Sequence, residues 1–140
     1  MPIYRTKNEN FFKKWSPEMA YVLGFFTADG NMIKNKRGGY YIEFTGCDLE
    51  ILEKIKTLLK SSNKITGRRR TERSKVCYRI QIRSKNLFDD LLQLGMVPCK
   101  SNIIRLPHIP QLYFTDFLRG YFDGDGCVYF KQNWAKDRSK

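Results

Sequence analysis

Two segments, far apart in the chain, share one pattern of small and acidic residues. The first reads AYVLGFFTADG and the second reads LRGYFDGDG. In each, a glycine within an apolar run stands five positions before an aspartate, Gly24 before Asp29 and Gly120 before Asp125. A single Asp-Gly pair after a helix is most often a helix stop, because glycine accepts the left-handed cap conformation. Two copies at matched spacing are much harder to attribute to chance.

The glycines within these segments indicate a close helix–helix interface. Glycine inside a helix costs roughly 1 kcal/mol relative to alanine, so it is tolerated mainly where two backbones must touch. Gly24 and Ala28 are four residues apart, as are Gly120 and Gly124, and each pair therefore lies on one helix face. Packing these two faces together would bring the C-terminal ends of the helices side by side.

Such an interface would also bring Asp29 and Asp125 together. A carboxylate at a helix C-terminus is disfavoured by the helix dipole, and two carboxylates repel each other. A divalent cation relieves both effects, so we expect Mg²⁺ or a similar ion at Asp29 and Asp125, beside Ala28 and Gly124. Paired carboxylates with such a metal commonly activate water on a phosphodiester. The alternative is two buried helices with capping turns and no metal.

The charge of the chain narrows the class of partner. The 140 residues include 26 Lys and Arg against 14 Asp and Glu, for a net charge of +12, which points to nucleic acid or an anionic membrane surface. The longest apolar run, residues 19–28, is too short to cross a bilayer and no signal peptide is visible, so we expect an intracellular protein outside the membrane. Four scattered cysteines and a single histidine disfavour a zinc site and indicate reduced thiols.

The spacing of apolar residues predicts an α+β fold in which helices alternate with hairpins. The expected elements are helix 17–28 capped by Ser16, strands 32–36 and 40–45, helix 48–60, strands 64–70 and 75–83, a helix capped by Ser84 or Asn86 and ending at Leu94, helix 113–122, and strand 127–131. The last helix and strand begin to repeat the opening of the chain.

If the two hairpins form one antiparallel sheet, residue alternation sorts their side chains onto two faces. The inner face would be apolar, with Ile42, Phe44 and Ile80 among its members. The expected outer face consists of Glu43, Lys64, Thr66, Arg68, Arg70, Lys75, Arg79, Gln81 and Arg83. Arg can read guanine and Gln can read adenine in the DNA major groove. An ordinary solvated face is the alternative, and the charge of the whole chain favours nucleic acid over it.

With both motifs placed, the sequence resembles the LAGLIDADG homing endonuclease family. VLGFFTADG and LRGYFDGDG are each similar to the family motif, and LGMVPCKS, residues 94–101, is similar to the loop before the second motif. The family order αββαββα in each half matches the order expected above. Residues 1–14 are expected to form a loose N-terminal basic arm. The resemblance implies a first half-domain over residues 15–110 and the start of a second half over 111–140.

The resemblance implies a sequence-specific endonuclease of double-stranded DNA that uses Mg²⁺ and belongs to an intron or other mobile element. It assigns Asp29 and Asp125 to the metal, and Lys100 to the scissile phosphates, where it would stabilise charge. It assigns DNA readout to the outer sheet face, with Glu43 assisting near the centre. Thr27 departs from the motif, which more often has an acid there, and Arg119 stands where a small residue is common.

Three alternatives follow from the short second half. A complete cutting centre would need two chains that form a homodimer or exchange their ends. A non-catalytic relative, either a DNA-binding regulator or an intron maturase acting on RNA, would use the same fold, although retention of both acids argues against it. A vestigial fragment with neither activity is the third alternative.

Overall fold

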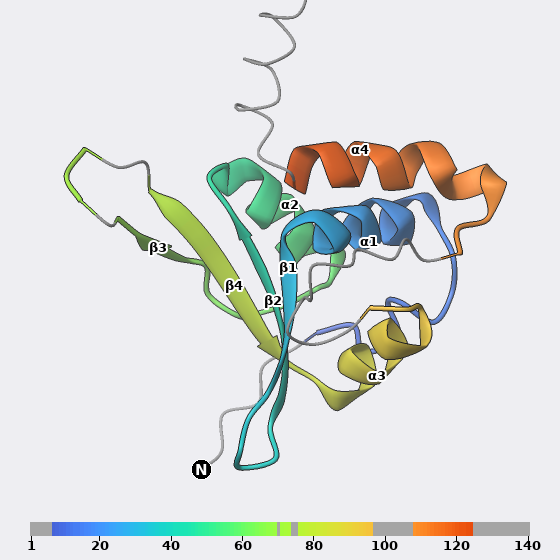
Figure 1. Ribbon diagram of the computed structural model, residues 1–140, viewed down its shortest axis with the longest axis horizontal. Helices are drawn as coiled ribbons and strands as arrows, with labels where there is room; N and C mark the ends of the chain where they lie inside the picture. Colours follow the sequence, from blue (N-terminus) through green and yellow to red (C-terminus); the bar gives the residue numbers. More distant parts are fainter. Residues whose placement is uncertain (1–6, 70, 74–75, 97–107, 125–140) are drawn as a thin grey trace, which may run out of the picture.

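The computed structural model describes residues 7–69, 71–73, 76–96 and 108–124, and these form an α+β fold (Figure 1). The elements are α1 (Pro17–Asp29), β1 (Gly30–Lys34), β2 (Tyr40–Gly46), α2 (Leu49–Leu58), β3 (Thr66–Arg68), β4 (Cys77–Arg83), α3 (Lys85–Gln93), the short 3-10 helix η1 (Gln111–Tyr113) and α4 (Phe114–Gly124). The expected α+β class and the αββαββα order of the first half are confirmed. The strand expected at 127–131 lies outside the described residues.

One antiparallel sheet, with strand order β1-β2-β4-β3, forms the floor of the core. Ile42 lies opposite Ile82 and Phe44 opposite Ile80, and all four side chains are fully buried. Helices α1 and α2 pack against this inner face, and α1 is buried along nearly its whole length. Burying apolar surface from both layers supplies the main free energy of folding for such a domain. None of the described helices covers the opposite face of the sheet (Figure 1).

Side-chain caps set the starts of three helices. Ser16 Oγ accepts a hydrogen bond from the Met19 backbone N–H at 3.0 Å, and Asp48 Oδ1 accepts one from Glu50 at 3.0 Å. Ser84, rather than Asn86, caps α3, because its Oγ accepts from the Leu87 N–H at 3.2 Å. Each bond satisfies a backbone donor that has no partner within the helix.

The first strand begins earlier than the sequence predicts. Helix α1 runs directly into β1 at Gly30, which has an extended backbone with φ of −96° and donates its N–H to the Phe26 carbonyl. Gly30 is therefore not a left-handed helix stop. A Cβ at this position would overlap the Phe26 ring, so glycine is needed there for close packing.

The third strand is shorter than the expected 64–70. The register that pairs Thr66 with Arg79 would place Lys64 opposite Gln81. The side-chain amide of Asn63 instead donates to the Gln81 backbone carbonyl at 2.9 Å, so the acceptor that a longer ladder would use is already engaged. Lys64 lies outside the strand as a result.

Residues 7–14, the described part of the expected N-terminal arm, pack onto the domain. Phe12 is buried, and the Asn8 N–H donates to the Leu59 carbonyl at 2.7 Å. Lys13 forms an ion pair with the largely buried Asp90 at 3.0 Å. The ring of Trp15 then stacks on Tyr113, which joins the arm to the segment leading into α4. Among the described residues, no helix has the length and apolar character needed to cross a bilayer.

Candidate functional site

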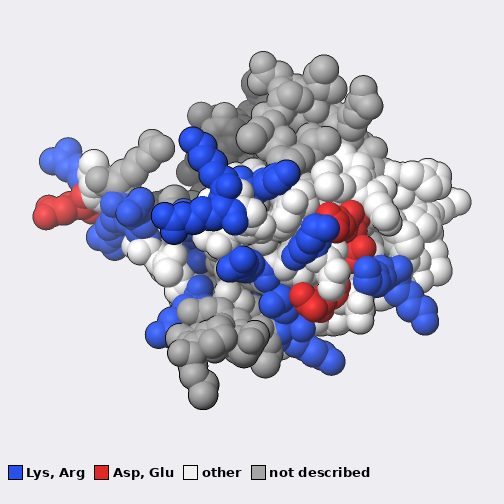
Figure 2. All heavy atoms as spheres, turned by 90° about the horizontal axis from the view of Figure 1, so that it is seen from below, with Lys and Arg blue, Asp and Glu red and all other residues white. Residues whose placement is uncertain are grey.

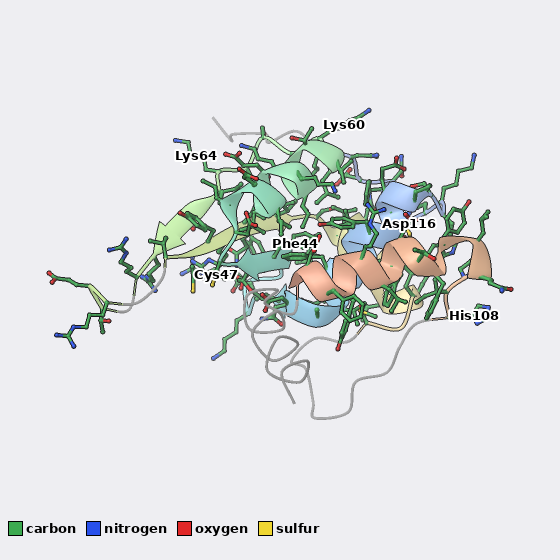
Figure 3. All side chains as sticks on the ribbon, turned by 90° about the horizontal axis from the view of Figure 1, so that it is seen from above. Phe44, Cys47, Lys60, Lys64, His108 and Asp116 are labelled. Carbon is green, nitrogen blue, oxygen red and sulfur yellow. The ribbon has the colours of Figure 1, made fainter. Side chains whose placement is uncertain are left out.

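Helices α1 and α4 lie side by side along their lengths, as both views of the ribbon show (Figures 1 and 3). A Cβ built on Gly24 would overlap the backbone carbonyl of Phe117, and one built on Gly120 would overlap that of Tyr21. Only glycine lets the two backbones approach this closely. Residue numbers rise together along the seam, so the helices are parallel and their C-terminal ends meet.

The seam continues to the last residues of both helices. A Cβ on Gly124 would lie 2.8 Å from the Phe25 carbonyl oxygen and 3.1 Å from the Ala28 Cβ. The structure therefore brings together all four residues expected at the helix interface, Gly24, Ala28, Gly120 and Gly124. The residues immediately before the two candidate acids are in contact.

Asp29 is the last residue of α1 and is partly buried. Its backbone carbonyl accepts a hydrogen bond from Thr45 Oγ1 at 3.1 Å, which fixes the end of α1 to the outer side of β2. The other two residues expected to be catalytic, Asp125 and Lys100, lie outside the described residues. The structure thus places one of the three at the meeting point of the two helices.

The chemistry of this helix junction fits a hard divalent cation. Carboxylate and backbone carbonyl oxygens are the ligands that Mg²⁺ and Ca²⁺ prefer, and the last carbonyls of a helix have no partner within it. Asp29 offers a carboxylate at the end of the seam where Ala28 and Gly124 are in contact. Asp125 follows Gly124 directly in sequence. A cation would offset the unfavourable interaction of the Asp29 carboxylate with the C-terminal end of its helix.

The sheet face opposite the core carries the residues expected to contact DNA, as far as these are described. Between β2 and β4, Glu43 lies opposite Gln81 and Tyr41 lies opposite Arg83. Arg79 of β4 lies between Thr45 of β2 and Thr66 of β3. The exposed members are Thr66, Arg68, Arg79, Gln81 and Arg83, with Lys64 exposed just before β3. Arg70 and Lys75 lie outside the described residues.

Basic side chains dominate one side of the molecule (Figure 2). Lys and Arg spread from the β3–β4 hairpin at the left of that view towards its middle, whereas acidic side chains gather mainly to the right. Together with the net charge of +12, this distribution gives a surface suited to a polyanion.

Glu43 holds two of the outer-face side chains in place. Its side chain is 12% exposed, and its carboxylate accepts a hydrogen bond from Gln81 Nε2 at 3.3 Å and lies 3.8 Å from the Arg79 guanidinium. These contacts restrict both neighbours, which come from the adjacent strand β4. Glu43 therefore acts on the outer face chiefly as a positioning residue.

A polar link between the two motif helices, in addition to the glycine seam, was not predicted from the sequence. Tyr21 Oη, in an almost fully buried side chain, donates a hydrogen bond of 2.5 Å to Asp123 Oδ2, and Lys54 Nζ lies 4.2 Å from the centre of the Tyr21 ring. Burial, and then the hydrogen bond and charge of Asp123, raise the pKa of Tyr21 well above its usual range. No pattern in the sequence distinguishes this tyrosine from its apolar neighbours in α1.

Thr27 occupies the motif position where an acid is more common. Its Oγ1 donates back to the Leu23 carbonyl at 2.8 Å and contacts Met96 Sδ at 3.6 Å, so the hydroxyl is satisfied inside the core. A carboxylate at this buried position would need a charged or strongly donating partner. The departure from the motif thus suits the local packing.

Comparison with known proteins gives the family. A model of the LAGLIDADG-like domain matches residues 16–94, which span α1 to the end of α3. The chain belongs to the LAGLIDADG family. Membership indicates a nuclease or DNA-binding role, and nucleases of this family generally use divalent metals. The family also points to dimerisation.

A curated relative extends this comparison beyond the matched domain. It is an uncharacterised protein of Methanocaldococcus jannaschii, 28% identical over 120 residues, an alignment that covers 81% of this chain. The chain spans only 40% of the length of that relative. The division into residues 1–14, 15–110 and 111–140 stays a prediction, although the LAGLIDADG match falls within its middle part.

Proposed function

We propose that this LAGLIDADG chain is a DNA-recognition and metal-binding half of a homing endonuclease, which cleaves double-stranded DNA at a specific sequence with Mg²⁺. The observation that carries the proposal is the contact between Gly124 and Ala28 at the end of the glycine seam. In this proposal the residues that follow these two positions in the sequence, Asp29 after Ala28 and Asp125 after Gly124, together form the metal site.

In this proposal Asp29 and Asp125 hold the cation, and Lys100 stabilises negative charge on the scissile phosphate. When bound, the cation supplies Lewis acidity at the phosphate and a more acidic water. Thr45 orients the end of α1 through its hydrogen bond to the Asp29 carbonyl. The tight seam keeps this arrangement rigid, because neither helix can slide without a clash of backbones.

The outer sheet face supplies the recognition surface. Its exposed arginines contact phosphates and bases, and Arg79 and Gln81, oriented by Glu43, are the best candidates for reading base edges. Arg83, beside the Tyr41 ring, lies farther along the same strand and can contact the backbone of the DNA.

The described residues offer one sheet of this kind, which covers one half-site. A double-strand cut therefore calls for a second half, supplied by a second copy of the chain or by a longer polypeptide. This chain spans 40% of the length of the Methanocaldococcus jannaschii relative, which is consistent with a longer polypeptide that contains both halves.

The test begins with duplexes selected by binding from a random pool, since the target is not specified by the fold. Selected duplexes are then incubated with the protein in Mg²⁺ or Ca²⁺ and assayed for nicks and breaks. We expect cleavage by the wild type in Mg²⁺, and binding without cleavage by Asp29→Asn and Asp125→Asn. Asp116→Asn, an acid on α4 paired with Arg119 away from the junction, is the matched control and should cleave normally.

Cleavage by both junction variants would reject the proposed metal site. Selective binding with no metal-dependent cleavage by the wild type would instead identify a non-catalytic DNA-binding member of the family.

A further inference from the structure

Cys47 and Cys77 form a thiol pair on the outer side of the sheet. Their Sγ atoms are 3.8 Å apart, although the residues are 30 positions apart in sequence, and both side chains are exposed. Gly46 lies opposite Tyr78 in the last printed pair of the β2–β4 ladder, so Cys47 and Cys77 occupy the next opposed position. Figure 3 labels Cys47 at this end of β2, on the side of the β3–β4 hairpin.

The set of nearby ligands suits a disulfide better than a shared metal ion. Two thiolates on one tetrahedral metal ion would lie about 3.8 Å apart, given metal–sulfur bonds of roughly 2.3 Å, so the separation fits a metal as well, but such an ion takes four ligands. Among the described residues, no group of three His, Cys, Asp or Glu side chains forms a metal-ligand set. A disulfide requires the sulfurs to approach to about 2.05 Å, a movement of roughly 0.9 Å for each, which rotation of two exposed side chains at the end of a ladder can supply.

We propose that Cys47 and Cys77 are a redox-active pair that forms an intramolecular disulfide on exposure to hydrogen peroxide. One thiolate attacks the peroxide, forming an S–O bond as the O–O bond breaks, and the departing hydroxide takes up a proton to become water. The second sulfur then attacks the sulfenic acid; the S–S bond forms, the S–O bond breaks, and a second water leaves with the remaining proton. The two thiols together give two electrons to the peroxide.

The bond would tie the base of the β3–β4 hairpin to β2. Cys77 is the first residue of β4 and pairs with Arg68 of β3, the strand at the sheet edge. The hairpin also carries the exposed Arg69 and Arg73. The edge strand β3 is held to β4 by only three paired residues. Oxidation would therefore restrict the local opening of the β3–β4 hairpin. This inference is independent of DNA cleavage.

The experiment uses the full chain with Cys99→Ser and Cys127→Ser, so that only the pair remains. After treatment with hydrogen peroxide, we expect an intact monomer lacking two hydrogens, a linked peptide joining residues 47 and 77, and full reversal by dithiothreitol. Amide exchange in the β3–β4 hairpin should slow by about tenfold, and the Tm should rise by roughly 5–15 °C. If the double replacement prevents folding, peptide mapping of the four-cysteine chain provides the same readout.

Cys47→Ser and Cys77→Ser, each in that background, are the matched controls and should show neither the linked peptide nor the slower exchange. Retention of both thiols in the folded monomer after treatment, or formation of intermolecular dimers alone, would overturn the proposal.

Discussion

The backbone carbonyl of Tyr21 lies where a side chain on residue 120 would begin, so Gly120 brings α4 into backbone contact with α1. The reciprocal contact places the Phe117 carbonyl against Gly24. These two contacts set the spacing of the motif helices, and through it the position of every group at their C-terminal ends.

Replacing Gly120 by alanine tests the seam directly. The added methyl group meets backbone atoms that cannot rotate away, so we expect Gly120→Ala to lower the free energy of unfolding by about 3 kcal/mol or more, despite the higher helix propensity of alanine. Thr115→Ala, at an exposed position of the same helix, should change it by less than about 0.5 kcal/mol. Urea unfolding followed by circular dichroism measures both. A Gly120→Ala protein as stable as the wild type would show that the helices are not in contact there.

Glu43→Gln tests the positioning of Arg79 and Gln81. The substitution removes the charge that holds Arg79. We expect discrimination between selected and random duplexes to fall by about tenfold, while affinity for random duplex stays equal or rises, because one negative charge is lost. Glu72→Gln, at an exposed position of the β3–β4 hairpin, is the control for the charge change alone. Equal losses of affinity for both kinds of duplex would contradict a positioning role.

Arg83→Ala tests the sheet as a phosphate-binding surface. Loss of one phosphate contact should make the slope of log affinity against log salt concentration less negative by about 0.9. Arg119, on α4 and paired with Asp116, lies on the helical layer, and Arg119→Ala should leave the slope unchanged. The measurement is a fluorescence titration at four salt concentrations. A larger effect of Arg119→Ala would place the DNA on the helices instead.

Tyr21→Phe tests the polar link between the helices through its pH dependence. The pKa of Tyr21 is raised in the folded protein, so folding favours its protonated form. The contribution of the protonated Tyr21 to the free energy of unfolding is therefore fully present below the unfolded-state pKa of about 10, and it is lost as the pH rises further. We expect Tyr21→Phe to lower the free energy of unfolding by about 1–3 kcal/mol at pH 7. Above about pH 10, the free energy of unfolding should fall less steeply with pH in the variant than in the wild type.

Urea midpoints between pH 7 and 11 provide the comparison for Tyr21. Tyr113→Phe preserves the stack on Trp15 and is the matched control for removal of a tyrosine hydroxyl. Parallel slopes for Tyr21→Phe and the wild type would show that Tyr21 does not couple folding to pH.

Much of the fold could be predicted because local signals and tertiary packing agree. Ser16 and Asp48 are strong N-cap residues with apolar helical spacing behind them, and both cap helices in the structure. The alternation of Ile80 and Ile82 with Gln81 likewise identifies the two faces of β4. The paired motifs identified the family itself, which the LAGLIDADG match confirms.

The remaining errors come from tertiary contacts that no local pattern records. The first strand was expected from residue 32, yet Gly30 is already an extended residue of β1, pressed against the Phe26 ring. The side chain of Asn63 engages β4 and thereby shortens β3. The proximity of Cys47 and Cys77 follows from strand register, which sequence spacing alone does not specify.

In the proposed metal site, the two motif helices jointly hold one divalent cation at Asp29 and Asp125. Its most direct test is paramagnetic broadening of backbone amide signals by Mn²⁺ in the isotopically labelled chain. We predict selective broadening of the signals from residues 28–30 and 124–126, removed by excess Mg²⁺ and absent in both Asp29→Asn and Asp125→Asn. Broadening confined to other acidic residues, or unchanged in the two variants, would contradict the account.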